Sequence, residues 1–522
     1  MGGLEASIPL VLIGSRSNHS QDRRERGDTP RDLTSRSPRL PLSPIELLLP
    51  NGFAERAIVL GDACPSALAP APSEQGSDGA PVDLVLLAPS GDQRRDPKWI
   101  QRAVHIAASR LSSSGMVYVV PSRAMSLRRA LGSSGLHSAG TLLHVPDLAR
   151  SRHVVPVGTA AERYALSGRL PMRRLKRFAA TAALRSPWTT TLVPTGTLLR
   201  RPPAIPLAGW LFELEGSPRP PGSALLTVSM AAAGGNIVHR FSGGETVPDA
   251  VAKVSARAND ELHGLLRVAP AAARAGARVP SVLSSGTLAS VPLVLQSAVS
   301  GRPAALLIEQ KHRVVRDLQE RVATWLERWG RASAQVRELT HADLERFVLS
   351  PAIELAALAT ERTSYLEYLS ALCSRAVGAR CPFVPSHGDL TVANIVIDEC
   401  PELGIVDWEE ASEDSLPLMD FFYATADAVA AAHGYADRAE AFVSCFAPDG
   451  EHVLFLRALR RRLAGALGVD DLVQEVCFHA CWLHHAANEA GRSADSRTGP
   501  FVTILQTIAS EPERFRLAEA TR

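Results

Sequence analysis

The sequence predicts two folded regions, an α/β region built on a parallel sheet followed by a two-lobed α+β region. Short apolar runs alternate with a helical pattern between residues 57 and 120. A Pro- and Gly-rich segment, EGSPRPPGS, interrupts the chain at 215–223 and predicts a linker. Three strand-like runs then precede a helical pattern after residue 224. The length of 522 residues suits about two to four domains.

The first 45 residues are rich in Arg, Ser, Asp and Pro and lack apolar periodicity, so we expect a flexible segment. Residues 46–214 hold the α/β region. Strand, helix and strand follow one another there, which predicts a parallel sheet. The runs are AIVL at 57–60, VDLVLL at 82–87, WIQRAVHIAASRL at 99–111 and GMVYVV at 115–120.

The order VDLVLLAP, helix, LSSSGMVYVV and LGSSGLHSAG resembles the later half of class I S-adenosylmethionine-dependent methyltransferases. The cofactor loop of that family carries several glycines. The corresponding segment here, IVLGDACPSALAP, has only Gly61, together with Pro65 and Pro70. The resemblance therefore implies a methyltransferase-like scaffold that has lost catalysis. A plain structural domain and an active methyltransferase are the alternatives.

Composition excludes several classes of protein. Lys plus Arg number 56 against 54 Asp plus Glu, for a formal net charge of +2. This balance gives no electrostatic reason to expect nucleic acid or a membrane surface as a partner. The seven cysteines are scattered, which indicates reduced thiols rather than a disulfide scaffold. No apolar run approaches the roughly 20 residues of a membrane span, and we expect a cytoplasmic protein.

The stretch from Pro385 to Tyr423 carries the most specific pattern. Asp389 is followed five positions later by Asn394, and a strand, a turn and a second strand then lead to Asp407. Phosphoryl transfer needs a carboxylate for the attacking hydroxyl and oxygen ligands for magnesium beside the nucleotide phosphates. A loop, a hairpin and an acid at the end of a strand would place these three side chains around one pocket.

An Asp-x-x-x-x-Asn spacing followed by a metal-binding Asp is the catalytic arrangement of protein kinases. With HGDLTVANIVID, IVDWE and PLMDF in this order, residues 224–510 resemble the aminoglycoside phosphotransferase and choline kinase-like family. The resemblance implies a protein-kinase-like fold with an N-lobe at about 224–298 and a C-lobe at about 299–510. It implies Asp389 as catalytic base and Asn394 and Asp407 as magnesium ligands. His387 would shape the catalytic loop and Asp420 would brace it.

The resemblance also assigns a nucleotide-binding set upstream. Lys253, in the strand-like run AVAKVS, is one of only four lysines in the chain and would grip the phosphates, with Glu261 as its partner. Arginine would replace it poorly, because a planar guanidinium differs from an ammonium in reach and geometry. Gln296 and Ala298 would contact adenine through their main chain. The preceding glycine-containing turn, AAAGGN, suits a loop over phosphates.

The predicted activity is ATP- and Mg²⁺-dependent transfer of the γ-phosphoryl group to a hydroxyl of a small molecule. An aminoglycoside, a sugar, a choline-like compound or another metabolite would serve as acceptor. Two alternatives remain for the motif: an Asx-rich pair of turns without chemistry, and a catalytically silent pseudokinase that acts as a scaffold or regulator.

Two further patterns near the motif allow two interpretations each. The acidic run Glu409, Glu410, Glu413 and Asp414 would attract a cationic acceptor, or would be a solvated loop. Cys477, Cys481, His484 and His485 follow helical spacing. They offer ligands that zinc prefers, but an amphipathic helix packed in the C-lobe is the favoured interpretation.

Overall fold

The structure of the chain is a computed structural model. It describes the main chain of residues 10–11, 45–49, 51, 53–60, 81–90, 92–93, 96–120, 131–132, 134–145, 153–165, 195–202, 208–215, 223–229, 235–242, 245, 247–308, 314–356, 362–492 and 499–517. The segment 61–80, which includes the glycine-poor loop, lies outside these residues, as does most of the 215–223 linker.

The chain forms two compact units, each made of two stretches of sequence. Residues 1–256 and 283–296 make the first unit, and residues 257–282 and 297–522 make the second. The chain therefore passes between the units three times.

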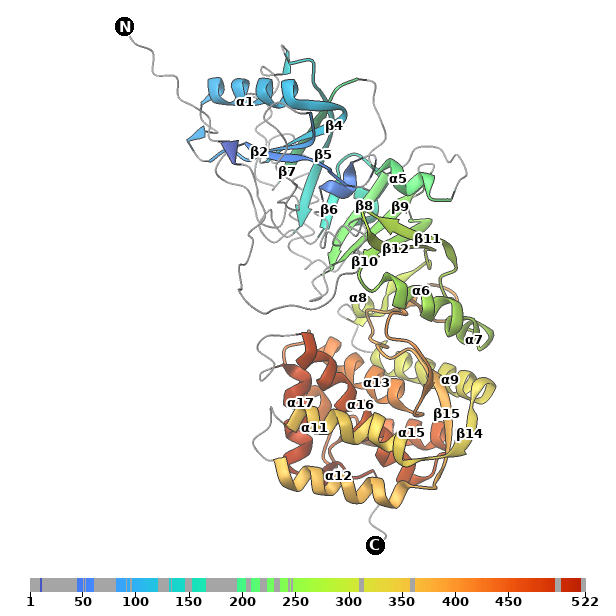
Figure 1. Cartoon of the computed structure of the whole chain (residues 1–522). Helices are drawn as coiled ribbons and strands as arrows, with labels where there is room; N and C mark the ends of the chain where they lie inside the picture. The colour runs from blue at the N-terminus through green and yellow to red at the C-terminus, as the bar shows by residue number, and fades with distance from the viewer. Residues whose placement is uncertain are drawn as a thin grey trace, which may run out of the picture. The chain divides into compact units, whose positions relative to one another are not determined.

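The first unit contains, among its described residues, one sheet of twelve strands in the order β1-β2-β3-β4-β7-β5-β6-β8-β9-β10-β12-β11 (Figure 1). Its strands are β1 (Leu10–Val11), β2 (Ala57–Leu60), β3 (Val82–Leu87), β4 (Leu111–Val119), β5 (His137–Val145), β6 (His153–Pro156), β7 (Thr195–Arg200), β8 (Ser223–Ser229), β9 (Gly235–Phe241), β10 (Ala250–Ser255), β11 (Val282–Leu288) and β12 (Val291–Ser297). Its helical segments are the 3₁₀ turn η1 (Glu46–Leu48), α1 (Pro97–Arg110), α3 (Ala160–Tyr164) and α5 (Gly209–Glu213).

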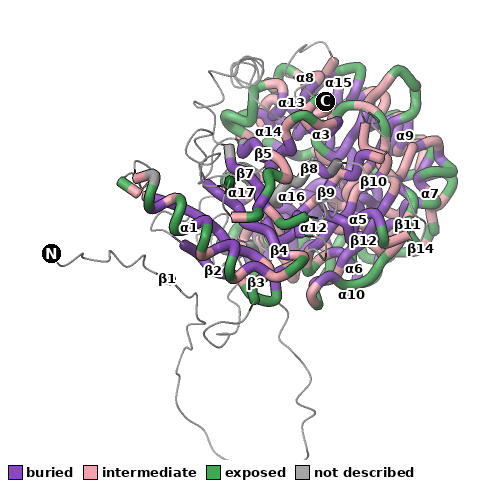
Figure 2. The backbone as a smooth tube through the Cα atoms, turned by 90° about the horizontal axis from the view of Figure 1, so that it is seen from above, coloured by how far each residue is buried: buried purple, intermediate pink, exposed green. Residues whose placement is uncertain are grey.

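Both faces of the sheet around β3 are buried, which explains the nearly continuous apolar run of this strand. Leu84 and Leu86 pack on one face with η1 and α5, while Val85 and Leu87 pack on the other beneath α1. Helix α1 is buried on its sheet side and exposed on the opposite side (Figure 2). Its N-cap is Asp96, whose side chain accepts from the Lys98 N–H at 2.9 Å.

The prediction of a parallel sheet is correct only for β2, β3 and β4. Strands β7, β5 and β6 continue the sheet with antiparallel neighbours, so the sheet is mixed. Helix α1 connects β3 to β4 and returns the chain to the end of the sheet at which β3 begins. The two strands therefore run parallel. The segment expected to resemble the late methyltransferase step instead begins β5, which pairs with β7. A methyltransferase-like fold is not established by this topology.

The sheet continues past the predicted boundary between the two regions. Strand β6 pairs with β8 through Val154 and Leu226, so the strands expected to form the small lobe extend the first sheet. The fully buried Arg240 of β9 reinforces this continuity, since it bonds Asp249 at 2.8 Å and Glu215 at 3.2 Å. Strands β8, β9 and β10 therefore belong to the sheet of the first unit.

The second unit is mainly helical. Its helices are α6 (Ala258–Arg267), α7 (Ala269–Arg274), α8 (Ala304–Ile308), α9 (Val314–Ser333), α10 (His341–Leu344), the π-helical turn η6 (Glu345–Leu349), α11 (Ser350–Ala356), α12 (Arg362–Ala376), α13 (Met419–Ala432), α14 (Arg438–Phe446), α15 (Val453–Leu467), α16 (Asp471–Arg492), α17 (Pro500–Ser510) and the 3₁₀ turn η7 (Pro512–Phe515). Two small sheets accompany them, β13 (Arg302–Pro303) with β16 (Ile395–Ile397) and β17 (Gly404–Ile405), and β14 (Gln335–Glu338) with β15 (Arg380–Ser386) and β18 (Ser412–Ser415).

Helix α13 lies at the centre of this unit. Every residue from Asp420 to Ala431 is buried, which fits a helix that is apolar nearly all round. Helices α9, α14 and α16 pack against it. None of the described helices of the chain is both long and apolar enough to cross a bilayer.

Candidate active site

The loop between β15 and β16 holds Asp389 and Asn394 together. The Asn394 side-chain amide donates to the Asp389 carboxylate at 3.2 Å and to the Asp389 carbonyl at 2.9 Å. The main chain between them closes two turns, Thr391 N–H to Asp389 O at 2.8 Å and Asn394 N–H to Thr391 O at 3.0 Å. The five-residue spacing thus brings a carboxylate and an amide side by side.

Asp420, the first acid of α13, holds the entry to this loop. Its carboxylate accepts from the N–H groups of His387 and Gly388 at 2.7 and 3.0 Å. Gly388 has a φ of +79°, and a Cβ there would lie 2.3 Å from the Glu410 carbonyl, so only glycine fits. Burial raises the pKa of Asp420 to about 6, although the two N–H groups act in the opposite direction.

His387 connects the loop to the strand before Asp407. Its Nε2 lies 3.1 Å from the Val406 carbonyl, and its Nδ1 lies 3.4 Å from the Asp389 N–H. This pair of contacts fits a neutral ring that donates from Nε2 and accepts at Nδ1. The ring also packs against Trp408, with centroids 4.9 Å apart.

The electrostatic environment of Asp389 suits a base that works near neutral pH. Burial raises its pKa to about 7, and the negative charge of Asp407 adds to the rise. Tyr423, one turn after Asp420 on α13, partly opposes this rise and lowers the pKa of Asp389 through its hydroxyl. The Tyr423 ring stacks on His485 with centroids 3.5 Å apart. The sequence did not indicate this stack of Tyr423 on His485, because α13 and α16 meet only in the folded chain.

Asp407 follows β17 in an unusual backbone conformation. Its φ is +72°, in the left-handed region that side chains other than glycine rarely adopt. Such strain persists where the surrounding structure imposes it, and it concentrates at functional sites. The next residue, Trp408, is fully buried and bonds through its indole N–H to the Ile405 carbonyl at 3.1 Å.

Helix α6, which carries Glu261, packs directly on the segment after Asp407. A Cβ on Gly264 would lie 2.1 Å from the Trp408 carbonyl oxygen, so the helix and this segment touch through their main chains. At the start of the helix, Arg257 donates to the Glu409 carbonyl at 2.8 Å and to the side chains of Glu409 and Glu410. Glu261 itself is fully buried.

The other residues assigned to nucleotide binding are divided between the units. Lys253 lies on β10, opposite Ile237 of β9, and is 8% exposed. Gln296 lies on β12 and is buried. Both belong to the first unit, while Ala298, Glu261 and the catalytic loop belong to the second. The proposed joint roles of these residues stay predictions.

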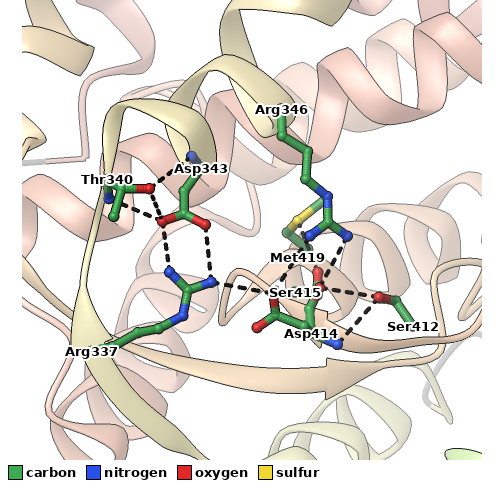
Figure 3. A network of polar contacts seen from close by, with 8 residues as sticks. All are labelled: Arg337, Thr340, Asp343, Arg346, Ser412, Asp414, Ser415 and Met419. Atoms are coloured by element: carbon green, nitrogen blue, oxygen red, sulfur yellow. Dashed lines mark hydrogen bonds and ion pairs between the residues drawn. The ribbon is translucent and has the colours of Figure 1, made fainter.

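Each acid of the run after Asp407 is ion-paired with an arginine of its own unit. Arg257 pairs with Glu409 and Glu410, and Arg267 lies 3.1 Å from Glu413. Figure 3 shows Arg337 between Asp343 and Asp414, with Arg346 on the other side of Asp414. These acids are therefore already ion-paired, and a cationic acceptor would have to compete with the arginines for them.

The Cys and His residues singled out by their spacing lie on α16, and Cys477, Cys481 and His485 are buried there. This agrees with the interpretation of a helix packed in the C-terminal region. Cys477 and Cys481 are fully buried, and burial raises the pKa of both thiols. His484 lies 3.1 Å from the Asn488 amide. Within the described ranges, no group of three or more His, Cys, Asp or Glu side chains could hold a metal ion.

Part of the chain is similar in sequence to a known protein family. Residues 232–452 match the model described as the phosphotransferase enzyme family, APH. The match spans both the predicted lysine strand and the catalytic loop. This match supports the prediction that the C-terminal region is a phosphotransferase. No curated protein matches the chain in sequence.

Solved structures with detectable similarity include several aminoglycoside phosphotransferases. APH(3'')-Id from Streptomyces rimosus is 20% identical, with 50% of this chain and 92% of that chain covered and a TM-score of 0.33. A thermostable mutant of APH(4)-Ia with ADP and hygromycin B is 12% identical, with coverage of 60% and 98% and a TM-score of 0.39. Spectinomycin phosphotransferase APH(9)-Ia, with ADP and spectinomycin, is 10% identical, with coverage of 56% and 93% and a TM-score of 0.33.

Proposed function

We propose that this protein transfers the γ-phosphoryl group of ATP to a hydroxyl of a small molecule, with Mg²⁺ as the metal. The observation that carries the proposal is the contact between Asp389 and Asn394, on a loop whose entry is held by Asp420. The charge of Asp407 acts on the same carboxylate. The family match over residues 232–452 supports the phosphotransferase class.

Asp389 would orient the acceptor hydroxyl and take its proton. A pKa near 7 means that a large fraction of the carboxylate is ionised at neutral pH and is still basic enough to accept a proton. Asn394 holds this carboxylate by its amide nitrogen, which fixes the direction in which the base points. General base catalysis of this kind contributes roughly 10²–10⁴-fold in rate.

The donor atoms of the site fit magnesium. The amide nitrogen of Asn394 is used by Asp389, so its side-chain oxygen would be the atom that holds the metal, and Asp407 would supply a carboxylate. Two protein ligands suffice, because Mg²⁺ usually takes its remaining oxygens from phosphates and water. When bound, the ion would neutralise charge on the transferring phosphoryl group. Lys253, with Glu261 as its partner, would hold the nucleotide phosphates, and the main chain at Gln296 and Ala298 would bind adenine.

The acceptor is a hydroxylated small molecule: an aminoglycoside, a sugar, a choline-like compound or another metabolite. The acids of the run Glu409–Asp414 are already paired with arginines, so a cationic acceptor would have to displace these partners to bind there. A screen of hydroxylated metabolites and aminoglycosides for acceptor-dependent ADP release would identify the class.

The decisive variants are Asp389→Asn and Asp407→Ala. With an acceptor found by the screen, each should lose at least about 10²-fold in kcat, because one lacks the base and the other a metal ligand. Glu320→Gln, which removes one partner of the exposed ion pair with Arg462 on α15, should keep the wild-type rate. Turnover equal to wild type in either site variant would exclude the proposal. Magnesium-dependent ATP binding without any transfer would favour the pseudokinase alternative.

A further inference from the structure

A second acid of α13, Asp427, holds the part of the catalytic loop that follows Asp389 in sequence. Asp427 lies two helical turns beyond Asp420, so both acids face the loop from the same side of the helix. The N–H of Val392 donates to its Oδ2 at 2.9 Å. The Val392 carbonyl in turn accepts from the N–H of Ala305 at 3.1 Å. The main chain of Val392 is thus fixed at both of its polar groups.

The charge of Asp427 is balanced within the same cluster. Its side chain is 0% exposed, and Arg438 donates to its Oδ1 at 2.7 Å. The Tyr435 hydroxyl adds a bond to Oδ2 at 3.2 Å. A buried carboxylate requires such donors, since an ion removed from water without them is strongly unfavourable. Arg438 therefore allows the charged carboxylate of Asp427 to lie beneath the loop.

A tight turn after α13 positions the two donors, Tyr435 and Arg438, beside Asp427. Gly434 and Tyr435 adopt φ values of +65° and +57°, and the Tyr435 N–H bonds the Ala430 carbonyl at 2.8 Å. Arg438 is then the first residue of α14, and its guanidinium carbon lies 4.5 Å from the centre of the Tyr435 ring. The turn folds the chain back so that both side chains reach Asp427.

We propose that Asp427, neutralised by Arg438, is a positioning residue for Asp389 and Asn394. Val392 lies between these two residues in sequence. Asp420 fixes the loop before Asp389, and Asp427 fixes it after Asp389. Without the Asp427 acceptor, the buried N–H of Val392 would have to find another partner, and the loop would shift to provide one. The catalytic part of this inference rests on the proposed phosphotransferase function.

Hydrogen exchange of the peptide spanning residues 387–395 tests the bracing directly and needs no activity. In Asp427→Ala, the Val392 amide should exchange at least about 10-fold faster than in wild type, because its acceptor is gone. The exposed control Glu320→Gln should leave this peptide unchanged. Unaltered exchange of the loop in a folded Asp427→Ala protein would overturn the proposal.

Kinetics test the positioning role. A loop displaced by about 1 Å is expected to lower kcat by up to about 10²-fold, while the KM for ATP changes less than about threefold. The double variant Asp427→Asn/Arg438→Gln keeps an acceptor for Val392 without an unpaired charge and should recover most of kcat. If Asp427→Ala does not fold, this double variant compared with Asp427→Asn alone provides the same test. Faster loop exchange with wild-type kcat, or a double variant no better than the single one, would refute the role.

Failure of the proposed function gives a different result. If wild type transfers no phosphoryl group to any acceptor, the phosphotransferase proposal is excluded. The exchange of the 387–395 peptide still shows whether Asp427 holds the loop.

Discussion

The N–H of His387 lies 2.7 Å from the buried carboxylate of Asp420, and through it helix α13 holds the residue two positions before Asp389. The same carboxylate accepts from the Gly388 N–H at 3.0 Å. Because α13 is buried along almost its whole length, it is a rigid support for the loop.

Asp420→Ala should therefore impair both stability and catalysis. The substitution removes the acceptor of two buried N–H groups, at a cost of about 3 kcal/mol in the free energy of unfolding. The loop that carries Asp389 loses its fixed entry, so kcat should fall by about 10²-fold under conditions where the protein is folded. Urea unfolding and ADP release measure the two effects. Asp449→Ala, at an exposed acid paired with Arg514, should match wild type in both, and equal behaviour of the two variants would contradict the prediction.

The sequence could predict the catalytic loop because its determinants are local. The spacing of Asp389 and Asn394 lies within one loop, and the structure brings the two side chains into contact. The helical packing of Cys477 and Cys481 was equally visible in the periodicity of one segment. The match of residues 232–452 to the phosphotransferase family supports the class expected for the C-terminal region, and the roles of single residues remain predictions.

Features that depend on distant pairing were not predictable from patterns. Strand β7 inserts between β4 and β5, which no local periodicity indicates, and the sheet is mixed as a result. The pairing of β6 with β8 carries the first sheet past the Pro- and Gly-rich segment, although that composition is typical of a linker. Likewise, Tyr423 beside Asp389 and Arg438 beside Asp427 depend on how α13, α14 and α16 pack.

Arg240→Ala should destabilise the first unit strongly. The side chain is fully buried and bonds Asp249, Glu215 and the Leu211 carbonyl, so its removal leaves carboxylates without their cation. Removal of one partner from a buried ion pair costs about 3–5 kcal/mol. Arg102→Ala, at an exposed pair on α1, should change stability by less than about 1 kcal/mol. Thermal unfolding followed by circular dichroism distinguishes the two, and similar transition temperatures would refute the role of Arg240.

The network around Asp343 should make stability depend on pH. Asp343 closes the capping box at the start of α10 and receives two bonds from Arg337, at 2.6 and 2.9 Å (Figure 3). The hydrogen bond from Arg337, more than any other contact, holds the pKa of Asp343 at about 2. A lowered pKa means that the ionised carboxylate stabilises the fold above its unfolded pKa of about 4, and that this contribution is lost as pH falls toward 2.

Asp343→Asn isolates this contribution. The difference in unfolding free energy between wild type and the variant should be about 1 kcal/mol at pH 6, after allowance for solvent screening of the partly exposed Arg337. It should shrink steadily between pH 4 and pH 2. Urea titrations at several pH values measure it, with Glu320→Gln as the control. A difference that stays constant over this range would show that the charge of Asp343 does not contribute.

Gly264→Ala should separate helix α6 from the segment after Asp407. The added Cβ would lie 2.1 Å from the Trp408 carbonyl oxygen, and main-chain atoms on both sides prevent a small local adjustment. Overpacking of this kind costs about 1–3 kcal/mol, and displacement of Asp407 should also weaken magnesium-dependent nucleotide binding. Gly465→Ala is a matched control within α15, because nothing lies within 4 Å of its added Cβ. That control should be more stable than wild type by about 0.5–1 kcal/mol, since alanine favours helix. If both substitutions raise the transition temperature in thermal unfolding, α6 does not pack against Trp408 as closely as the structure indicates.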